Sequence, residues 1–536
     1  MISSATDPSA PGAATSPPPR STGFLARLRE RRDVFSLMAL TLAAKPMGFV
    51  VQLLIASSFG AQSETDAYFV CLYLASFLAN IGVGVFTTLF IPLYFDHSAQ
   101  NDERKTIGFL NAIMIIFSAP LAIFTLVLLA APRLAIAIAA PGFDGETLAI
   151  AIRMTRLMAV GTILTGIGGY MSALLNVRRV FWLPGMIPIL QGGVTVACIL
   201  GLRDSLGGLA LPVSFVAAAL LRVLVQIPAM ARLGFIRFVR PAWRDPLLAK
   251  LLSLARPVLL SSVIVQALFM TDKILGSLLD PGSVSALGYA TTVNQLTLQI
   301  FAGTLVTVMF TDMAALISRG EMAGFRAAFR RDAGYLLAII VPFAVVAAVK
   351  SREIVAILYE RGKFDASATD ATASALVMYS IGLPTLGLNM LLGRVFHAMK
   401  EMRARMFIDL AWLASNLLVA LALIKPLGVA GLALGTSIAS AVNVVCALIY
   451  LRRRHGGVGE GAVVRVFVES IAAGSVMAAF IAWTPLGFLA GGEAEPSRAA
   501  RMIALCATGA LGTVVYASVV VALRKIGSAP RAVAAS

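Results

Sequence analysis

Apolar stretches long enough to cross a membrane recur along almost the whole chain. A helix needs about 20 apolar residues to span a hydrocarbon core of roughly 30 Å, and such stretches follow one another from Ser36 to Leu523. Only 13% of the residues are charged, whereas soluble domains have about 25%. The mean hydropathy is +0.87. We therefore predict an all-α membrane protein and not a soluble enzyme.

Counting the apolar stretches predicts about 14 transmembrane helices. In the first half of the chain they cover residues 36–60, 66–93, 107–131, 148–175, 183–202 and 208–231. In the second half they cover residues 251–279, 284–317, 334–349, 371–396, 406–424 and 428–451, with two more at 466–483 and 503–523.

Short matches between the two halves indicate an internal repeat. Phe143-Asp144 corresponds to Phe364-Asp365, and Gly208-Leu209-Ala210-Leu211 corresponds to Gly431-Leu432-Ala433-Leu434, at an offset of roughly 220 residues. Two six-helix lobes in the same orientation would hold a substrate site at their interface. The predicted division is a disordered tail (1–33), two lobes (34–240 and 241–455), two extra helices (456–525) and a C-terminal tail (526–536).

The basic residues predict the orientation of the chain. About 28 of the Lys and Arg residues fall on one side of the predicted helices and about 9 on the other, and cytoplasmic loops carry the excess. Both termini are therefore expected in the cytoplasm.

Several function classes are disfavoured by the sequence. The net charge is +17, but the basic residues form short clusters between apolar stretches without interleaved aromatics, so nucleic acid is not an expected partner. The three histidines, His97, His397 and His455, are scattered. No metal-ligand spacing and no P-loop are present. We expect no catalytic residues, no metal and no cofactor.

Ionisable residues inside predicted membrane helices are the first candidates for a functional site, because a charge at bilayer depth is costly without a partner or a cavity. Lys45 lies twelve residues after Asp33, about 18 Å along the first helix. It either faces a cavity as a cation for an anionic substrate, or extends to the headgroups. Asp66 opens the second helix, where capping of the helix is the favoured interpretation and substrate binding the alternative.

The seventh helix and two asparagines supply the other candidates. Asp272 and Lys273 are adjacent and must point apart, toward a substrate or toward an ion-pair partner on another helix. Asn80 and Asn294 are candidates for binding sugar hydroxyls, although hydrogen bonds between helices explain buried amides equally well. The substrate-binding candidates are Lys45, Asp66, Asn80, Asp272, Lys273 and Asn294.

Several short segments of the chain match the motifs of one known family. They are Phe59-Gly60, Thr65-Asp66-Ala67-Tyr68-Phe69, Ala140-Pro141-Gly142-Phe143, Ala173-Leu174-Leu175-Asn176, Trp243-Arg244-Asp245-Pro246, Pro281-Gly282-Ser283-Val284-Ser285-Ala286-Leu287, Glu360-Arg361-Gly362-Lys363-Phe364-Asp365 and Gly382-Leu383-Pro384. In these motifs the chain resembles the MurJ (MviN) family of lipid II flippases, part of the multidrug/oligosaccharidyl-lipid/polysaccharide exporter superfamily. The resemblance implies fourteen helices and a location in the bacterial inner membrane. It also implies a cationic cavity lined by the first, second, seventh and eighth helices, and a lipid-tail groove formed by the last two.

At the cavity positions the chain departs from this family. Lys45 stands where the family has an arginine in the first helix, while Val51, Ala79 and Thr292 occupy positions typical of further arginines. Lysine keeps the charge without the bidentate geometry that arginine offers to phosphate. We therefore expect a cavity that is less basic than the family pattern.

The expected function is translocation of an undecaprenyl-pyrophosphate-linked glycan by alternating access. The simplest cargo is lipid II, the peptidoglycan precursor, and the alternative is an exopolysaccharide or other lipid-linked repeat unit. Expected partners are the lipid-linked glycan, membrane lipids and enzymes of cell-wall or polysaccharide synthesis. A glycan polymerase or ligase is disfavoured because the loops are too short to hold its catalytic groups. A non-transporting scaffold would not need costly charges inside helices.

Overall fold

The computed structural model describes residues 46–100, 102–237, 239–484 and 497–528, and all regular structure in these ranges is helical. Eleven helical segments in the described residues are long and apolar enough to cross a membrane, and a shorter apolar helix covers Pro46–Phe59. The prediction of an all-α membrane protein is therefore confirmed. The predicted tail 1–33 and residues 529–536 lie outside the described residues, whereas residues 526–528 end the last helix.

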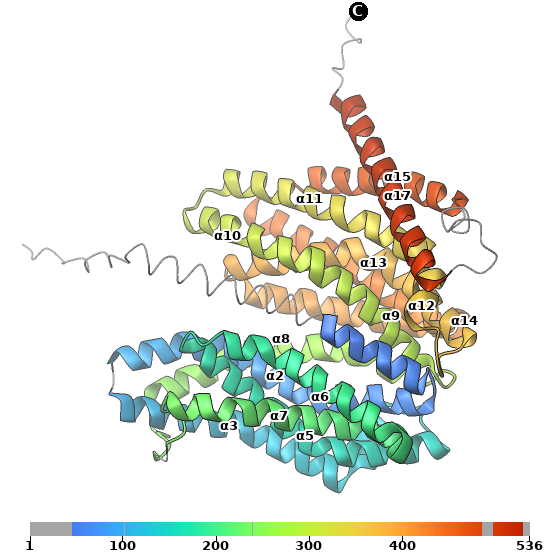
Figure 1. The fold of residues 1–536 in the computed structure, drawn as a ribbon. Coiled ribbons are helices and arrows are strands. Elements are labelled where there is room, and N and C mark those ends of the chain that lie inside the picture. Colours follow the sequence, from blue (N-terminus) through green and yellow to red (C-terminus); the bar gives the residue numbers. More distant parts are fainter. Residues whose placement is uncertain (1–45, 101, 238, 485–496, 529–536) are drawn as a thin grey trace, which may run out of the picture.

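The helices form two bundles that lie one above the other in Figure 1. The N-terminal bundle contains the helix Pro46–Phe59, α2 (Ser63–Gln100), α3 (Glu103–Ala130), α4 (Pro132–Ala139), α5 (Gly145–Val177), α6 (Trp182–Leu206), η1 (Gly207–Leu209) and α7 (Ala210–Arg232). The C-terminal bundle contains α8 (Pro246–Gly276), α9 (Ser283–Thr297), η2 (Leu298–Gly303), α10 (Thr304–Ser318), α11 (Met322–Val349), α12 (Ser351–Tyr359), α13 (Ala366–Ala398) and α14 (Met402–His455). Two more helices, α15 (Glu460–Trp483) and α17 (Arg498–Ser528), pack on α11.

Two glycines in left-handed conformations reverse the chain at equivalent places in the two bundles. Gly207, between α6 and α7, has φ 54° and ψ −134°, and Gly428, inside α14, has φ 55° and ψ −127°. Residues with a Cβ rarely adopt such angles, so glycine is required at both turns. Each of these two long segments therefore consists of two helices, which raises the number of candidate membrane spans in the described residues from eleven to thirteen. The count of about fourteen stays a prediction, since the first helix is described only from Pro46.

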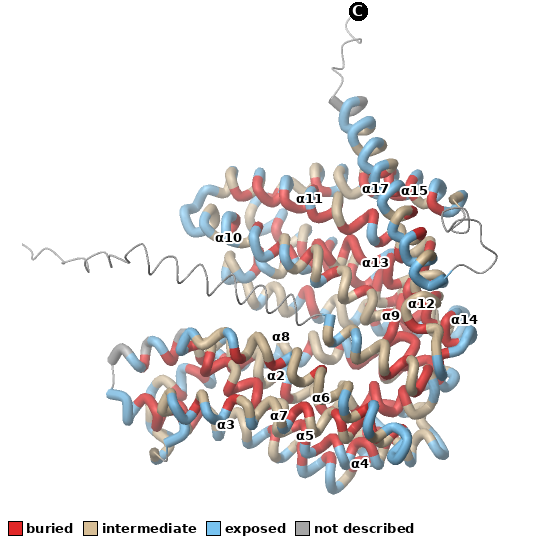
Figure 2. The backbone as a smooth tube through the Cα atoms, in the orientation of Figure 1, coloured by how far each residue is buried: buried red, intermediate tan, exposed pale blue. Residues whose placement is uncertain are grey.

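One deeply buried helix forms the centre of each bundle. In the most apolar window of α5 and of α13, 61% and 72% of the residues are buried, compared with 44% in α2 and 50% in α11. Figure 2 shows this burial along α13, with exposed residues toward the outer surfaces. The two helices are equally long, 33 residues each. Their equivalence supports the predicted repeat, while the domain boundaries stay predictions.

Two short helices, α4 and α12, and one irregular segment were not expected from the sequence. At 8 and 9 residues, α4 and α12 are too short to span a membrane. Each precedes the Phe-Asp pair that introduces the central helix of its bundle. The predicted helix 284–317 is interrupted by the π-helical turn η2, a feature often found at functional sites.

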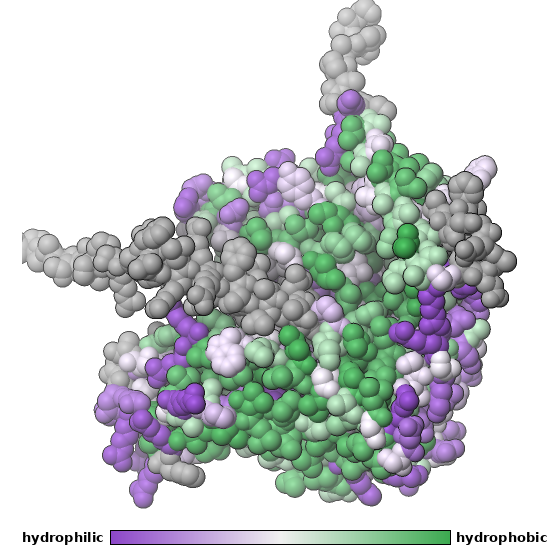
Figure 3. Space-filling view, viewed as in Figure 1, coloured by the Kyte–Doolittle hydropathy of each residue, from purple (hydrophilic) through white to green (hydrophobic). Residues whose placement is uncertain are grey.

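The surface matches a membrane protein. In Figure 3 a broad apolar band separates hydrophilic side chains at the left and right edges of the visible face. Large apolar side chains on several helices are exposed, among them Ile123, Leu418 and Val514 at 63%, 69% and 64%. Such a band would be unfavourable in water and is stable against lipid chains.

Candidate substrate cavity between the two bundles

A cluster of hydrogen bonds joins the two bundles where α2 and α9 begin. Asp66 accepts hydrogen bonds from the backbone N–H groups of Gly282 and Ser285, both at 2.7 Å, and from the Ser285 hydroxyl at 2.6 Å. Tyr289 donates to the carbonyl of Gly60 at 2.9 Å. We call these five residues the interbundle seal. Asp66 is buried within the seal, with only 3% of the residue exposed.

The start of α9 is an electrostatically favourable position for the Asp66 carboxylate. The first N–H groups of a helix have no partner inside the helix, and the helix end carries a partial positive charge. A carboxylate from α2 therefore satisfies the start of α9. The sequence favoured capping of the second helix by Asp66, whereas the carboxylate caps a helix of the other bundle instead.

Backbone contacts on either side of the seal bring the bundles together in a repeated pattern. A Cβ on Gly362 would lie 2.1 Å from the carbonyl oxygen of Ser57, and a Cβ on Gly142 would lie 2.1 Å from that of Ser277. Lys363 also donates its backbone N–H to Ser57 at 3.0 Å. Only glycine allows such approaches. The loop with Gly362 therefore packs against the end of the first helix, and the loop with Gly142 packs against the end of α8.

A cavity of about 600 Å³ begins one helical turn beyond the seal. Four helices line it: the helix Pro46–Phe59, α2, α8, and α9 with its π-helical continuation. The lining residues are Gly48, Phe49, Gln52, Phe69, Leu72, Tyr73, Ser76, Asn80, Gln266, Phe269, Gly288, Thr291, Thr292, Gln295, Leu296 and Gln299. These are the first, second, seventh and eighth helices, which the family resemblance implied.

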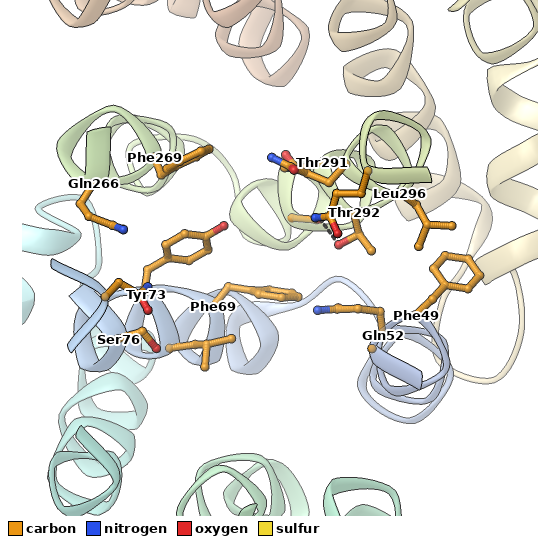
Figure 4. A pocket seen from close by; sticks show the side chains of 16 residues that line it. Phe49, Gln52, Phe69, Tyr73, Ser76, Gln266, Phe269, Thr291, Thr292 and Leu296 are labelled. Carbon is orange, nitrogen blue, oxygen red and sulfur yellow. Dashed lines mark hydrogen bonds between the residues drawn. The ribbon is translucent and has the colours of Figure 1, made fainter. Parts of the chain in front are cut away.

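The cavity wall combines aromatic rings with uncharged polar groups. Figure 4 shows Phe69 and Tyr73 on α2, Gln266 and Phe269 on α8, and Gln52 with Phe49 on the first helix, arranged around one space. None of the sixteen lining residues carries a formal charge. Such a wall can donate and accept hydrogen bonds and can stack on a flat apolar face.

Two of the predicted site residues, Asn80 and Asp66, differ in their position relative to the cavity. Asn80 is an exposed lining residue of the cavity. Asp66 is not a lining residue, because both of its oxygens are used in the seal. Lys45 lies outside the described residues, so its role stays a prediction.

The adjacent charges of α8 point apart, as expected. Asp272 accepts a hydrogen bond from Tyr379 at 2.8 Å and a longer one from Thr436 at 3.3 Å, both within the C-terminal bundle. These hydroxyl groups take the place of the ion pair that we considered. Lys273 is buried, and its Nζ lies 4.9 Å from the centre of the Tyr73 ring on α2, a cation–π contact between the bundles.

The amides divide between the cavity and the bundle cores. Asn294 is 4% exposed and its Oδ1 has no hydrogen-bond partner among the described residues. Asn389 bonds to α14, and Asn416 and Asn443 each join the two halves of α14 on either side of Gly428. Hydrogen bonds between packed helical segments are the ordinary role of buried amides in membrane helices.

The three departures from the family pattern fall at or near the cavity. Thr292 lines it, Ala79 is fully buried next to the lining residue Asn80, and Val51 precedes Gln52. The expectation of a less basic cavity stays a prediction, because Lys45 lies outside the described residues.

The glutamines of the cavity wall were not predicted from the sequence, because ionisable residues were taken as the first candidates. Gln52, Gln266, Gln295 and Gln299 all line the cavity. The signal was present in the eighth helix, where Thr291, Thr292, Gln295 and Gln299 recur at the spacing of a single helix face.

The sequence is similar to one known protein family along most of its length. A family model described as "Lipid II flippase MurJ" matches residues 55–492. The chain is 24% identical over 485 residues to the lipid II flippase MurJ of Burkholderia cenocepacia, covering 89% of this chain and 94% of that protein. It is 28% identical over 420 residues to a probable lipid II flippase MurJ of Buchnera aphidicola, covering 77% and 82%.

Solved structures share the fold. A structure titled "Lipid II flippase MurJ, inward closed conformation" superposes with a TM-score of 0.76 at 20% identity, covering 91% of this chain and 99% of that one. An inward-facing multidrug resistance MATE family transporter superposes with a TM-score of 0.63 at 14% identity, covering 79% and 99%. The family match extends over most of the sequence and the fold over nearly all of it, so this multi-pass membrane protein belongs to the MurJ family of lipid II flippases.

Proposed function

We propose that this protein moves an undecaprenyl-pyrophosphate-linked glycan, most simply lipid II, across the bacterial cytoplasmic membrane by alternating access. The observation that carries the proposal is the cavity between two bundles that are joined at one end by the interbundle seal. A carrier of this kind exposes one site to one side of the membrane at a time. A transporter, and not an enzyme, is the function that this geometry supports.

The seal acts as one of the two gates in this proposal. While Asp66 bonds to the start of α9, the bundles stay together at that end and the cavity can be reached only from elsewhere. Breaking these hydrogen bonds would let the bundles separate there. The polar head group would cross within the cavity, because a pyrophosphate cannot enter hydrocarbon without compensation.

The distribution of basic residues supports an orientation with both termini in the cytoplasm and the seal toward the outer leaflet. In this orientation the cavity accepts cargo from the inner leaflet. Lys45, chosen from the sequence alone, is our candidate for the cation that meets the pyrophosphate. Enzymes that make or use the lipid-linked glycan are the proposed partners.

Complementation tests the function directly. We expect this chain to restore growth to cells depleted of their own lipid II flippase, with membrane levels checked by immunoblotting. Matched expression of the Asp66→Asn variant serves as the comparison. Normal membrane levels without restored growth would rule out lipid II as the cargo.

The alternative cargo is an exopolysaccharide or other lipid-linked repeat unit. The observation that favours it is the uncharged cavity wall, with Thr292 at a position typical of an arginine. Vesicles containing the purified protein distinguish the two, because flipping of each labelled lipid can be measured separately.

A further inference from the structure

Three charged residues of the helices around the cavity are engaged in contacts away from it. Asp66 bonds to the start of α9, and Asp272 bonds to Tyr379 and Thr436. Lys273 is 2% exposed and lies over the Tyr73 ring. None of these three is among the lining residues, so the described wall offers a ligand no ionic contact.

The groups that the wall does offer are amides, hydroxyls and rings. Primary amides and hydroxyls both donate and accept hydrogen bonds, which suits ligands that also carry both kinds of group. Gln52 shows unused capacity, because its buried Oε1 has no partner among the described residues. Its side chain extends toward the space shared with Phe69 in Figure 4. A buried acceptor without a partner is costly, and a donor on a ligand would remove that cost.

Aromatic rings lie beside the polar groups of the wall, a combination that suits a sugar. Phe49, Phe69, Tyr73 and Phe269 lie among the polar groups of the wall. A pyranose ring has an apolar C–H face and a rim of hydroxyl and N-acetyl groups. It can place the face on an aromatic ring and the rim on amides.

We propose that this cavity binds the uncharged sugar portion of the cargo, and that the pyrophosphate is held outside the described wall. This inference rests on the proposed function, since it concerns which part of a lipid-linked glycan is recognised. Selectivity would then come from the glycan, and not from the pyrophosphate that all such lipids share.

The test compares three lipids on the purified full-length protein in nanodiscs. They are lipid II, undecaprenyl pyrophosphate carrying one N-acetylglucosamine, and undecaprenyl pyrophosphate without sugar. We expect the protein to bind at least one sugar-bearing lipid more than about tenfold more tightly than the sugar-free lipid, as two or three hydrogen bonds would give.

Substitutions in the wall sharpen the test. Gln52→Leu and Gln295→Leu should each weaken binding of the sugar-bearing lipid roughly three- to tenfold and leave the sugar-free lipid within about twofold. The matched control is Gln191→Leu in α6, where the amide donates one long hydrogen bond of 3.4 Å to Ala218. It should leave all three affinities unchanged, and thermal unfolding of each variant checks its folding.

The outcomes separate this inference from the proposed function. Equal binding of all three lipids to the unaltered protein, or equal weakening of all three by the wall variants, would overturn sugar recognition while leaving a flippase. Failure to bind any of the three lipids would overturn the proposed function and this inference with it. Preference for the single-sugar lipid over lipid II would support sugar recognition and favour the alternative cargo.

Discussion

Replacing Asp66 by asparagine should loosen the interbundle seal while preserving its shape. The carboxylate accepts three hydrogen bonds from α9, from two backbone N–H groups and the Ser285 hydroxyl. In the variant, one oxygen can still accept from Ser285. The new NH₂ group, however, faces the N–H of Gly282, so that bond is lost and the others no longer involve a charge.

The expected magnitude follows from these contacts. A hydrogen bond to a charged group contributes about 1.5–3 kcal/mol, compared with about 1 kcal/mol for a neutral one. Losing one such bond and weakening the other two gives about 3 kcal/mol, or roughly a hundredfold in the ratio of sealed to unsealed protein. A sealed state favoured by a hundred to one would become about equally populated with the unsealed state.

Spin-label distances across the seal measure this ratio. One label replaces Gln62 beside the seal, and the other replaces Ser367 in the first turn of α13, where both positions are exposed. Pulsed electron spin resonance on the Asp66→Asn protein should show a second, longer distance. The control is Asp102→Asn, because Asp102 caps its own helix through the N–H of Lys105 at 2.8 Å and does not bridge the bundles.

A distance distribution in Asp66→Asn that matches the unsubstituted protein would refute the argument. It would mean that the backbone contacts of the glycines hold the bundles together without the carboxylate. A second distance in both aspartate variants would instead indicate a general loss of helix capping.

Three further predictions concern the seal and the first helix. Gly362→Ala should lower the thermal unfolding temperature or the amount of folded protein, because the new Cβ would lie 2.1 Å from the Ser57 oxygen, whereas Gly393→Ala, with nothing within 4 Å, should not. Tyr289→Phe should shift the sealed-to-unsealed ratio about fivefold, the effect of one neutral hydrogen bond, and a shift as large as that of the aspartate variant would contradict this ranking. Lys45→Ala should abolish flipping with normal membrane insertion, and unchanged flipping would remove Lys45 from the proposed site.

The sequence was sufficient to predict the membrane fold, because hydrophobicity and turn residues act locally. Stretches of about 20 apolar residues form helices in lipid regardless of their neighbours. The repeat was visible for a similar reason. The Phe-Asp pairs and the Gly-Leu-Ala-Leu segments recur at nearly the same offset, and the structure adds the matched backbone angles of Gly207 and Gly428, which the sequence comparison did not use.

The partners of buried polar groups could not be predicted, because they depend on how distant helices meet. Asp66 caps α9, more than 200 residues away in sequence, and no local pattern specifies that pairing. Asp272 bonds to hydroxyl groups on α13 and α14, although a search for opposite charges would not choose them. The glutamines were overlooked because an amide inside a membrane helix has too many possible roles to identify one.

The seal and the cavity share the same two helices, which constrains how cargo can act on the gate. Phe69 follows Asp66 by three residues on α2, and Gly288 follows Ser285 by three on α9, so each pair lies on one helix face about one turn apart. A Cβ on Gly288 would lie 3.5 Å from the Phe69 ring. This contact forms the end of the cavity nearest the seal.

Opening the seal must therefore separate Phe69 from Gly288 and change the cavity itself. A ligand shifts a conformational equilibrium only by the difference in its affinity for the two states. A head group that contacts both sides of this end of the cavity would stabilise the sealed state and oppose opening. For cargo to promote release, it must bind more strongly to the separated bundles, so the groups that drive translocation are expected on walls that remain with one bundle, such as α2 with Tyr73 and Asn80.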